Sequence, residues 1–314
     1  MKLFKERILP GLLFTFFFVG LIIPTSIFGQ KNNNIGLTFR IIFFIISSFL
    51  LFCAVYELFS AFGIKKYISI ILGILFATTM FAPFEEFLDF ITLRKIVSNV
   101  NLASPNYLLK TYLRQMILDY QSVIFVLGFA LFFLFYEMKN NYYNTKADKL
   151  LRFLFILITL YLLSIAIKAF LYFVFFSYNY WILAIFASAI CDIMAYVFGM
   201  TMGRKIIKVG FAPKISPKKS WEGVFGGFTL TAIFILIFSF TMPLFNKNVV
   251  YILIATIFIP VVSILGDLYF SLLKRINYIK DYSQILKGHG GILDRLDSHT
   301  FVFFLLTFLC VYAL

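Results

Sequence analysis

The chain has 314 residues, of which 62% are hydrophobic and 13% are charged, and its formal net charge at pH 7 is +14. This composition is too apolar for a soluble domain of ordinary composition. The basic excess is not a nucleic-acid signal, because the solvated segments lack basic patches interleaved with exposed aromatic residues. The composition therefore indicates an integral membrane protein, in which clustered charge at membrane depth is expected to be functional.

Long apolar runs follow one another along the chain and predict an all-α, polytopic membrane protein with roughly nine spanning helices. We expect them at 8–28, 38–62, 66–84, 117–138, 150–176, 179–202, 223–245, 249–273 and 299–314. The first run follows the basic segment MKLFKER and resembles a signal peptide. It is long and lacks a small-residue cleavage pattern, so we expect a retained helix.

The polar residues are unevenly distributed, and we divide the chain on that basis. Residues 1–149 hold few clustered polar residues and are expected to form scaffold helices and lipid access. Residues 150–314 hold the polar clusters and are expected to be the catalytic region. We find no internal repeat of the kind that is typical of inverted-repeat transporters.

Basic residues predict the orientation, because they accumulate on the cytoplasmic side of membrane proteins. With nine spans and a cytoplasmic amino terminus, 20 of the 28 Lys and Arg residues fall inside. The two charged loops at 203–222 and 274–298 then face the cytoplasm. The expected location is the inner (plasma) membrane, with the polar site on the cytoplasmic side.

The stretch CDIMAYVFGMTMGRK, residues 191–205, is the first polar cluster. On a helix, Asp192 and Tyr196 lie one turn apart. Gly199 and Gly203 form a ridge of small residues that lets another helix approach closely. The carboxylate either hydrogen-bonds a neighbouring helix or belongs to a functional site, and this stretch alone leaves both readings open.

The second cluster, APKISPKKSWEGVFGG, spans residues 212–227. Pro213 and Pro217 prevent a helix from continuing through it. Phosphate-type donors then precede a helix expected to start near Trp221, namely Ser216, Lys218, Lys219 and Ser220. Because a helix amino terminus preceded by such groups favours anions, the cluster predicts a phosphate site. A solvated basic loop that only sets topology is the alternative.

The third cluster spans residues 267–298 and begins on a helix that leaves the membrane. Asp267 and Ser271 are four residues apart and share one helical face. The same face continues with the cations of Lys274 and Arg275. A carboxylate, a hydroxyl and two cations therefore leave the membrane together.

Asp294 and Asp297 are three residues apart and point into one space if their segment is helical. Oxygen ligands of this kind suit Mg²⁺, which takes one or two carboxylates and completes its shell with water and substrate phosphates. These two residues therefore extend the predicted phosphate site with candidate metal ligands.

A Gly-His-Gly-Gly turn precedes these two aspartates. Gly288, Gly290 and Gly291 leave room for backbone amides to approach a phosphate. His289 is a candidate hydrogen-bond donor or proton shuttle, although a lone histidine is more often structural.

These residues resemble the signature of a known family, the phosphatidate cytidylyltransferases, also called CDP-diacylglycerol synthases. The signature S-x-x-K-R-x4-K-D, a spacer and H-G-G-x-x-D-R-x-D is matched here by Ser271, Lys274, Arg275, Lys280, Asp281, His289, Gly290, Gly291, Asp294, Arg295 and Asp297. The upstream patterns D-x-x-A-Y and S-P-K-K-[ST]-W-E-G are matched by Asp192, Ala195, Tyr196 and residues 216–223. The resemblance covers the last two fifths of the chain, and the earlier helices match only in being apolar.

Two positions depart from the family pattern. Lys287 stands where the family usually has proline before the turn, which affects the shape of that loop. Cys191 stands where asparagine commonly precedes the aspartate, which suggests that position 191 serves packing. Neither departure removes a group assigned to the reaction.

The resemblance implies transfer of a cytidylyl group from CTP to phosphatidic acid, which gives CDP-diacylglycerol and pyrophosphate. The lipid phosphate is itself the nucleophile, so catalysis reduces to positioning and charge neutralisation. Mg²⁺ is the expected cofactor, with a second cation left open. Its principal ligands are expected to be Asp267 and Asp294, with Asp297 and Asp192 as further candidates.

The remaining expected roles form two sets. The catalytic set, which includes the cations that clamp phosphates, is Lys274, Arg275, Lys280, Asp281, His289 and Arg295. The substrate-binding set is Ser216, Lys218, Lys219, Ser220, Ser271, Gly288, Gly290 and Gly291. Membrane lipid is an expected partner, and the resemblance leaves a homodimer open.

Two functions from other classes compete with this reading. A CTP-dependent polyisoprenol or phytol kinase would share a polytopic fold and a basic face, but should lack the long series from Lys274 to Asp297. A transporter for an anionic solute would place charges near the bilayer midplane in broken helices. In this chain the charges concentrate toward one side of the predicted bundle.

Overall fold

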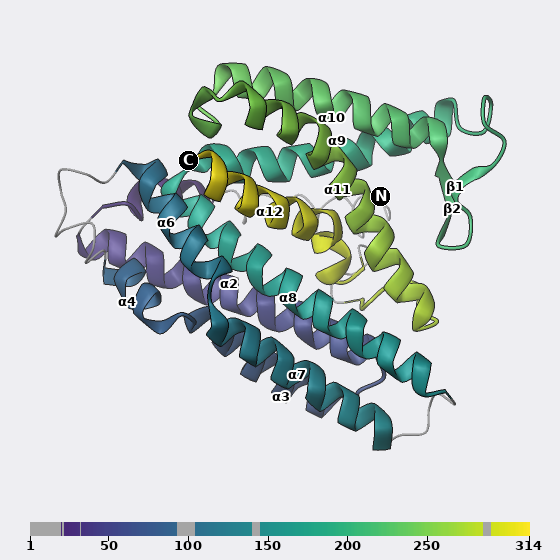
Figure 1. The fold of residues 1–314 in the computed structure, drawn as a ribbon, viewed down its shortest axis with the longest axis horizontal. Coiled ribbons are helices and arrows are strands. Elements are labelled where there is room, and N and C mark those ends of the chain that lie inside the picture. The colour runs from purple at the N-terminus through teal and green to yellow at the C-terminus, as the bar shows by residue number, and fades with distance from the viewer. Residues whose placement is uncertain (1–19, 21, 32, 93–103, 140–144, 285–289) are drawn as a thin grey trace, which may run out of the picture.

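The computed structural model describes residues 20, 22–31, 33–92, 104–139, 145–284 and 290–314. The described residues form a helical bundle with one small antiparallel hairpin (Figure 1). The elements up to residue 139 are α2 (Asn34–Ala61), α3 (Lys66–Ala77), η2 (Thr78–Phe81), α4 (Phe84–Thr92), α6 (Pro105–Ile117) and α7 (Tyr120–Lys139). The later elements are α8 (Lys146–Phe176), α9 (Tyr178–Thr201), β1 (Gly210–Ala212), β2 (Ser216–Ser220), α10 (Trp221–Thr241), η3 (Phe245–Lys247), α11 (Val249–Ile276) and α12 (Leu293–Ala313).

Seven helices in the described part of the chain are long and apolar enough to cross a membrane, which confirms the polytopic all-α prediction. They are α2, α7, α8, α9, α10, α11 and α12. The predicted span 8–28 falls largely on residues outside the described ranges, so the count of nine is not confirmed. The last helix begins at Leu293, earlier than predicted, because the polar residues of the signature form its first turns.

The predicted span 66–84 ends in a sharp bend. Its residues form α3 and η2, and the chain then bends by 68° into α4. Pro83 stands at this break, where it has no backbone N–H to continue a helical ladder. The two pieces together make an eighth candidate span.

Helix α12 lies inside the bundle (Figure 1). Helices α9, α10 and α11 lie on one side of it, and α2, α3, α7 and α8 lie on the other. The hairpin, the last turns of α11 and the first turn of α12 lie toward the same end of the molecule. The polar clusters that are distant in sequence are therefore gathered in the part of the bundle that lies toward the hairpin.

Small residues let α10 lie directly against α9. A Cβ atom at Gly223 would lie 2.6 Å from the backbone oxygen of Ala195, and one at Gly227 would lie 2.7 Å from that of Cys191. Both distances are shorter than real Cβ contacts, so only glycine fits at these positions. The close approach expected from Gly199 and Gly203 is made mainly by the glycines of α10.

Charged side chains buried among the spans are paired, as their cost in a bilayer requires. Arg152 of α8 donates to Glu137 of α7 at 3.0 Å and to the backbone oxygen of Phe62 at 2.8 Å. Lys168, also on α8, donates to Ser122 at 2.6 Å and to the backbone oxygen of Ala82 at 2.8 Å. These bonds tie α8 to its neighbours at two levels.

The α9–α10 contact gives the first testable prediction. Gly227→Ala should lower the free energy of unfolding by about 1–3 kcal/mol, because the added methyl group must push the helices apart. Gly128→Ala on α7 is the matched control, since a Cβ there meets nothing within 4 Å. Thermal unfolding of both purified variants measures the difference. Equal unfolding temperatures for the two variants would contradict the close contact.

Candidate active site

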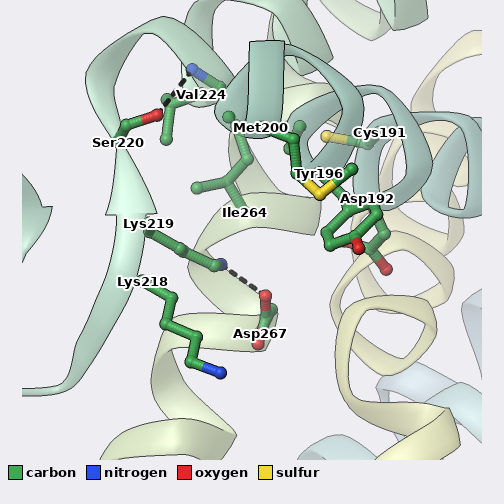
Figure 2. A pocket seen from close by; sticks show the side chains of 13 residues that line it. Cys191, Asp192, Tyr196, Met200, Lys218, Lys219, Ser220, Val224, Ile264 and Asp267 are labelled. Carbon is green, nitrogen blue, oxygen red and sulfur yellow. Dashed lines mark hydrogen bonds and ion pairs between the residues drawn. The ribbon is translucent and has the colours of Figure 1, made fainter. Parts of the chain in front are cut away.

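A pocket of about 490 Å³ brings together residues from α9, β2, α10 and α11 (Figure 2). The predicted site residues that line it are Asp192, Lys218, Lys219, Ser220 and Asp267. Figure 2 shows Lys218 and Lys219 extending from β2 toward the part of α11 that carries Asp267. The pocket therefore joins the first two clusters of the sequence to Asp267, the only predicted residue of the third cluster among its described lining residues.

Asp267 has two side-chain partners. Lys219 forms an ion pair with its carboxylate, and both side chains are about a quarter exposed (22% and 25%). Ser271, one turn later on α11, donates to the other carboxylate oxygen at 3.3 Å. The shared helical face predicted from the spacing is thus present. It carries a partly exposed carboxylate beside a cation.

Asp192 and Asp297 come from the two helices that flank this carboxylate. Ser298 of α12 donates through its hydroxyl to both carboxylate oxygens of Asp192, at 3.4 and 3.2 Å. The backbone N–H of Ser298 donates to Asp297 at 2.7 Å. The carboxyl groups of Asp192, Asp267 and Asp297 interact electrostatically with one another.

Backbone packing explains how these carboxyl groups come near each other. A Cβ atom at Gly266 would lie 2.8 Å from the backbone oxygen of Asp297, so α11 and α12 touch at this glycine. Asp267 is the next residue along α11. The contact therefore sets Asp267 beside the second turn of α12.

Asp294, in the first turn of α12, is fully engaged by other groups. Its Oδ1 accepts a hydrogen bond from Lys274 Nζ at 2.7 Å. Its Oδ2 accepts from the backbone N–H groups of Tyr282 and Gly291, both at 2.9 Å. Asp294 therefore joins the end of α11 to both ends of the intervening loop.

Tyr282 packs against Phe270 and Lys274 at this junction. Its hydroxyl donates to the backbone oxygen of Phe270 at 3.1 Å, and its ring lies 5.5 Å from Lys274 Nζ. Burial, followed by the negative charge of Asp294, raises the pKa of Tyr282. The phenol therefore stays protonated at physiological pH and acts as a donor.

The remaining predicted charged residues are not among those that line the pocket. Arg275 is exposed and donates through Nε to the backbone oxygen of Ile215, in the turn of the hairpin, at 3.2 Å. Lys280, Asp281 and Arg295 are also exposed. Ser216 is half-buried in β2, where it pairs with Ala212.

Part of the Gly-His-Gly-Gly turn falls outside the described residues. Gly288, His289 and the departure at Lys287 belong to that part. Gly290 has a φ of +79°, a backbone conformation that favours glycine. Gly291 donates its backbone N–H to Asp294, as described above.

Ser220 and Glu222 make hydrogen bonds at the amino terminus of α10. Ser220 caps the helix through a hydrogen bond from the Gly223 N–H to its hydroxyl, at 3.2 Å. The carboxylate of Glu222 accepts from the backbone N–H groups of Arg204, Ile206 and Ile207, at 3.1, 3.0 and 2.8 Å. The helix start near Trp221 is confirmed, and Glu222 fixes the chain that leaves α9.

Sequence reasoning missed Glu57, which contacts the signature segment from α2. It accepts hydrogen bonds from Ser283 and from the backbone N–H groups of Ile292 and Leu293. The available signal was an acidic residue inside an apolar run, which is costly in a membrane and indicates a paired or functional group.

The donor chemistry around the pocket fits a hard divalent cation. In the described part of the chain, no three His, Cys, Asp or Glu side chains are arranged to hold a metal by themselves. Mg²⁺ does not require such a cage, because it binds one or two carboxylates and keeps water and phosphate oxygens in its shell. The partly exposed carboxylate of Asp267, together with those of Asp192 and Asp297, offers oxygens of this kind.

Comparison with known proteins matches residues 35–313 to the Cytidylyltransferase family. Among curated relatives, the phosphatidate cytidylyltransferase of Haemophilus influenzae is 43% identical over 112 residues, which are 35% of this chain and 38% of that protein. That of Bacillus subtilis is 42% identical over 118 residues, 38% of this chain and 42% of that protein. The match to each relative therefore spans about two fifths of its length.

Glu222 gives a prediction that needs no substrate. Glu222→Ala removes the acceptor of three backbone N–H groups, so the segment after α9 should open more often. Trypsin should then cleave after Arg204 and Lys205 faster than in the wild type. Thr229→Ala, which removes an exposed hydroxyl from the same helix, should leave the rate unchanged. Equal cleavage rates in Glu222→Ala and the wild type would contradict this role.

Proposed function

The chain belongs to the cytidylyltransferase family, and on that premise we propose that it transfers the cytidylyl group of CTP to phosphatidic acid. The products are CDP-diacylglycerol and pyrophosphate. The observation that carries the proposal is the convergence of Asp192, Lys219 and Asp267 from three separate elements in one pocket at the end of a membrane bundle. Such a site can accept a charged nucleotide and the head group of a lipid together.

The reaction needs no nucleophile from the protein. An oxygen of the phosphatidate phosphate attacks the α-phosphorus of CTP and forms a new P–O bond. The bond between the α- and β-phosphates breaks, and its electron pair leaves with pyrophosphate. The protein therefore has to align two anions and offset their charge.

The cationic side chains of the site are suited to that task. Lys218 and Lys219 extend from β2 along one wall of the pocket. Lys274 and Arg275 lie at the end of α11, and Arg295 lies in the first turn of α12. Before substrate binds, Asp267 and Asp294 neutralise Lys219 and Lys274. A bound phosphate would take over these ammonium groups as hydrogen-bond donors.

We assign Mg²⁺ as the cofactor, held by Asp267 with Asp294, Asp297 and Asp192 as the surrounding carboxylates. When bound, it would offset the negative charge of the substrate phosphates. The hydroxyl of Ser271 orients Asp267, and the hydroxyl of Ser298 orients Asp192.

The test is product identification with the full chain in lipid nanodiscs. Incubation with CTP, Mg²⁺ and phosphatidic acid should yield a lipid with the mass of CDP-diacylglycerol, together with pyrophosphate. Omitting any one of the three should stop both products. A complete mixture that yields neither product would overturn the proposed function.

Asp267 provides a prediction within this function. Asp267→Asn should reduce turnover by well over tenfold, because it removes a charge that balances Lys219 and a carboxylate that suits Mg²⁺. Asp148→Asn is the control, since Asp148 is exposed at the start of α8, away from the pocket. If Asp267→Asn keeps more than about a tenth of the activity, a loss below about 1.4 kcal/mol, Asp267 is not a principal ligand.

We further propose that the site faces the cytoplasm and that the membrane is the inner one. Single cysteines can report this in a background without Cys53, Cys191 and Cys310. A cysteine at Lys214, exposed in the hairpin turn, should resist an impermeant thiol reagent in intact cells. Tyr107 is 58% exposed and lies on α6, at the end of the molecule away from the hairpin (Figure 1). A cysteine at this position should react. Labelling of position 214 from outside would overturn the orientation.

A further inference from the structure

Glu57 is a fully buried acid on α2, far from the signature in sequence. Its Oε1 accepts from the backbone N–H of Ile292 at 3.0 Å and from the Ser283 hydroxyl. Its Oε2 accepts from the backbone N–H of Leu293 at 2.7 Å. These partners lie 226 to 236 residues further along the chain. A helix of the amino-terminal half thus reaches the start of α12.

These bonds cap a helix that has no cap of its own. Ile292, the N-cap residue of α12, has an apolar side chain and makes no side-chain capping bond. The first N–H groups of a helix have no partner within it, and they attract negative charge. Glu57 supplies both the acceptor and the charge from a neighbouring span.

Glu57 and Asp294 act on adjacent groups. Asp294 binds the N–H of Gly291, and Glu57 binds the next two N–H groups along the chain. On the other side of the loop, Asp294 binds the N–H of Tyr282, and Glu57 binds the hydroxyl of Ser283. The two carboxyl groups therefore fix the first turn of α12 to the segment that follows α11.

Gly291 is required for this contact. A Cβ atom there would lie 2.5 Å from Oε2 and 2.7 Å from Oε1 of Glu57. Any other residue at this position would displace the carboxyl group. The glycine thus has a packing reason that is independent of phosphate binding.

The end of α2 is itself held in place. Arg152 donates to the backbone oxygen of Phe62, the C-cap residue of α2, at 2.8 Å. The same guanidinium donates to Asn277, the C-cap residue of α11, at 2.7 Å. Because one side chain binds both helix ends, α2 cannot shift relative to α11 without breaking these bonds.

We propose that Glu57 is a positioning residue of the reaction. By capping α12 it holds Asp294, Arg295 and Asp297 at the angle at which they act on the substrate phosphates. Glu57 contacts the backbone of the first turn of α12, and it influences the reaction through the position of that turn. This inference rests on the proposed function and extends it to the amino-terminal half of the chain.

Glu57→Gln is the direct test, because it replaces one accepting carboxylate oxygen with an NH₂ group, which would then face hydrogen-bond donors. Per folded molecule, kcat/KM should fall by about 10- to 100-fold, the range seen when groups that orient catalytic ligands are removed. The Mg²⁺ concentration for half-maximal rate should rise, because the carboxylates of α12 move. Folded protein is quantified by size-exclusion chromatography before each assay.

Asp119→Asn is the matched control. Asp119 is also buried and also caps a helix, since it accepts from the N–H groups of Gln121 and Ser122 at the start of α7. Its loss should lower the unfolding temperature and leave both kinetic readouts per folded molecule at wild-type values. If Glu57→Gln behaves in the same way, Glu57 is only structural and the proposal is overturned.

A double variant tests whether the effect passes through the contact with Gly291. Gly291→Ala alone should lower the rate, because the methyl group displaces the Glu57 carboxyl group. Adding Glu57→Asp withdraws that group by one methylene and should restore part of the rate. A double variant no faster than Gly291→Ala would contradict the proposed route.

Amide hydrogen exchange gives a readout that does not depend on turnover. Glu57→Gln should speed exchange at Ile292 and Leu293, and Asp119→Asn should not. Unchanged exchange in Glu57→Gln would overturn the capping contact while leaving the proposed function intact. A wild type that makes no CDP-diacylglycerol would overturn the proposed function, and the kinetic role of Glu57 with it, even if exchange responds as expected.

Discussion

The amino terminus of α12 is the point at which the two halves of the chain meet. Two carboxyl groups accept hydrogen bonds there: Asp294 from the N–H of Gly291, and Glu57 from those of Ile292 and Leu293. Backbone donors in a buried turn would be costly if they had no partner. The rest of the polar site follows from this turn, because Asp297 lies one turn later and Gly266 of α11 packs against its backbone.

The apolar environment explains why polar contacts are so specific here. A buried Arg152 or Lys168 is tolerated only because each donates to defined oxygens on neighbouring segments. The same pairing fixes the relative heights of α2, α8 and α11. The site is therefore assembled at the end of a bundle whose helices cannot slide independently.

The sequence predicted what depends on local pattern. The apolar runs located seven of the spans, and the spacing of Asp267 and Ser271 placed them on one face. The segment interrupted by Pro213 and Pro217 located the start of α10 near Trp221. Each of these depends on neighbours within about one turn.

Long-range contacts explain what the sequence did not predict. Glu57 appears alone in an apolar run, and its partners are more than two hundred residues away. The bend between α3 and α4 depends on how two short pieces pack, and the hairpin at 210–220 replaces what pattern alone could describe only as a proline-interrupted loop. Asp294 was expected as a metal ligand, which stays a prediction, and its observed hydrogen bonds close the loop between α11 and α12.

The central claim is that this end of the bundle transfers a cytidylyl group to a lipid phosphate. CTP labelled with ³²P at either its α- or its γ-phosphate, incubated with the protein, Mg²⁺ and phosphatidic acid, tests it most directly. Cytidylyl transfer predicts that the α-label enters the lipid and that the γ-label leaves in pyrophosphate. Entry of the γ-label into lipid would reveal a kinase and contradict the account.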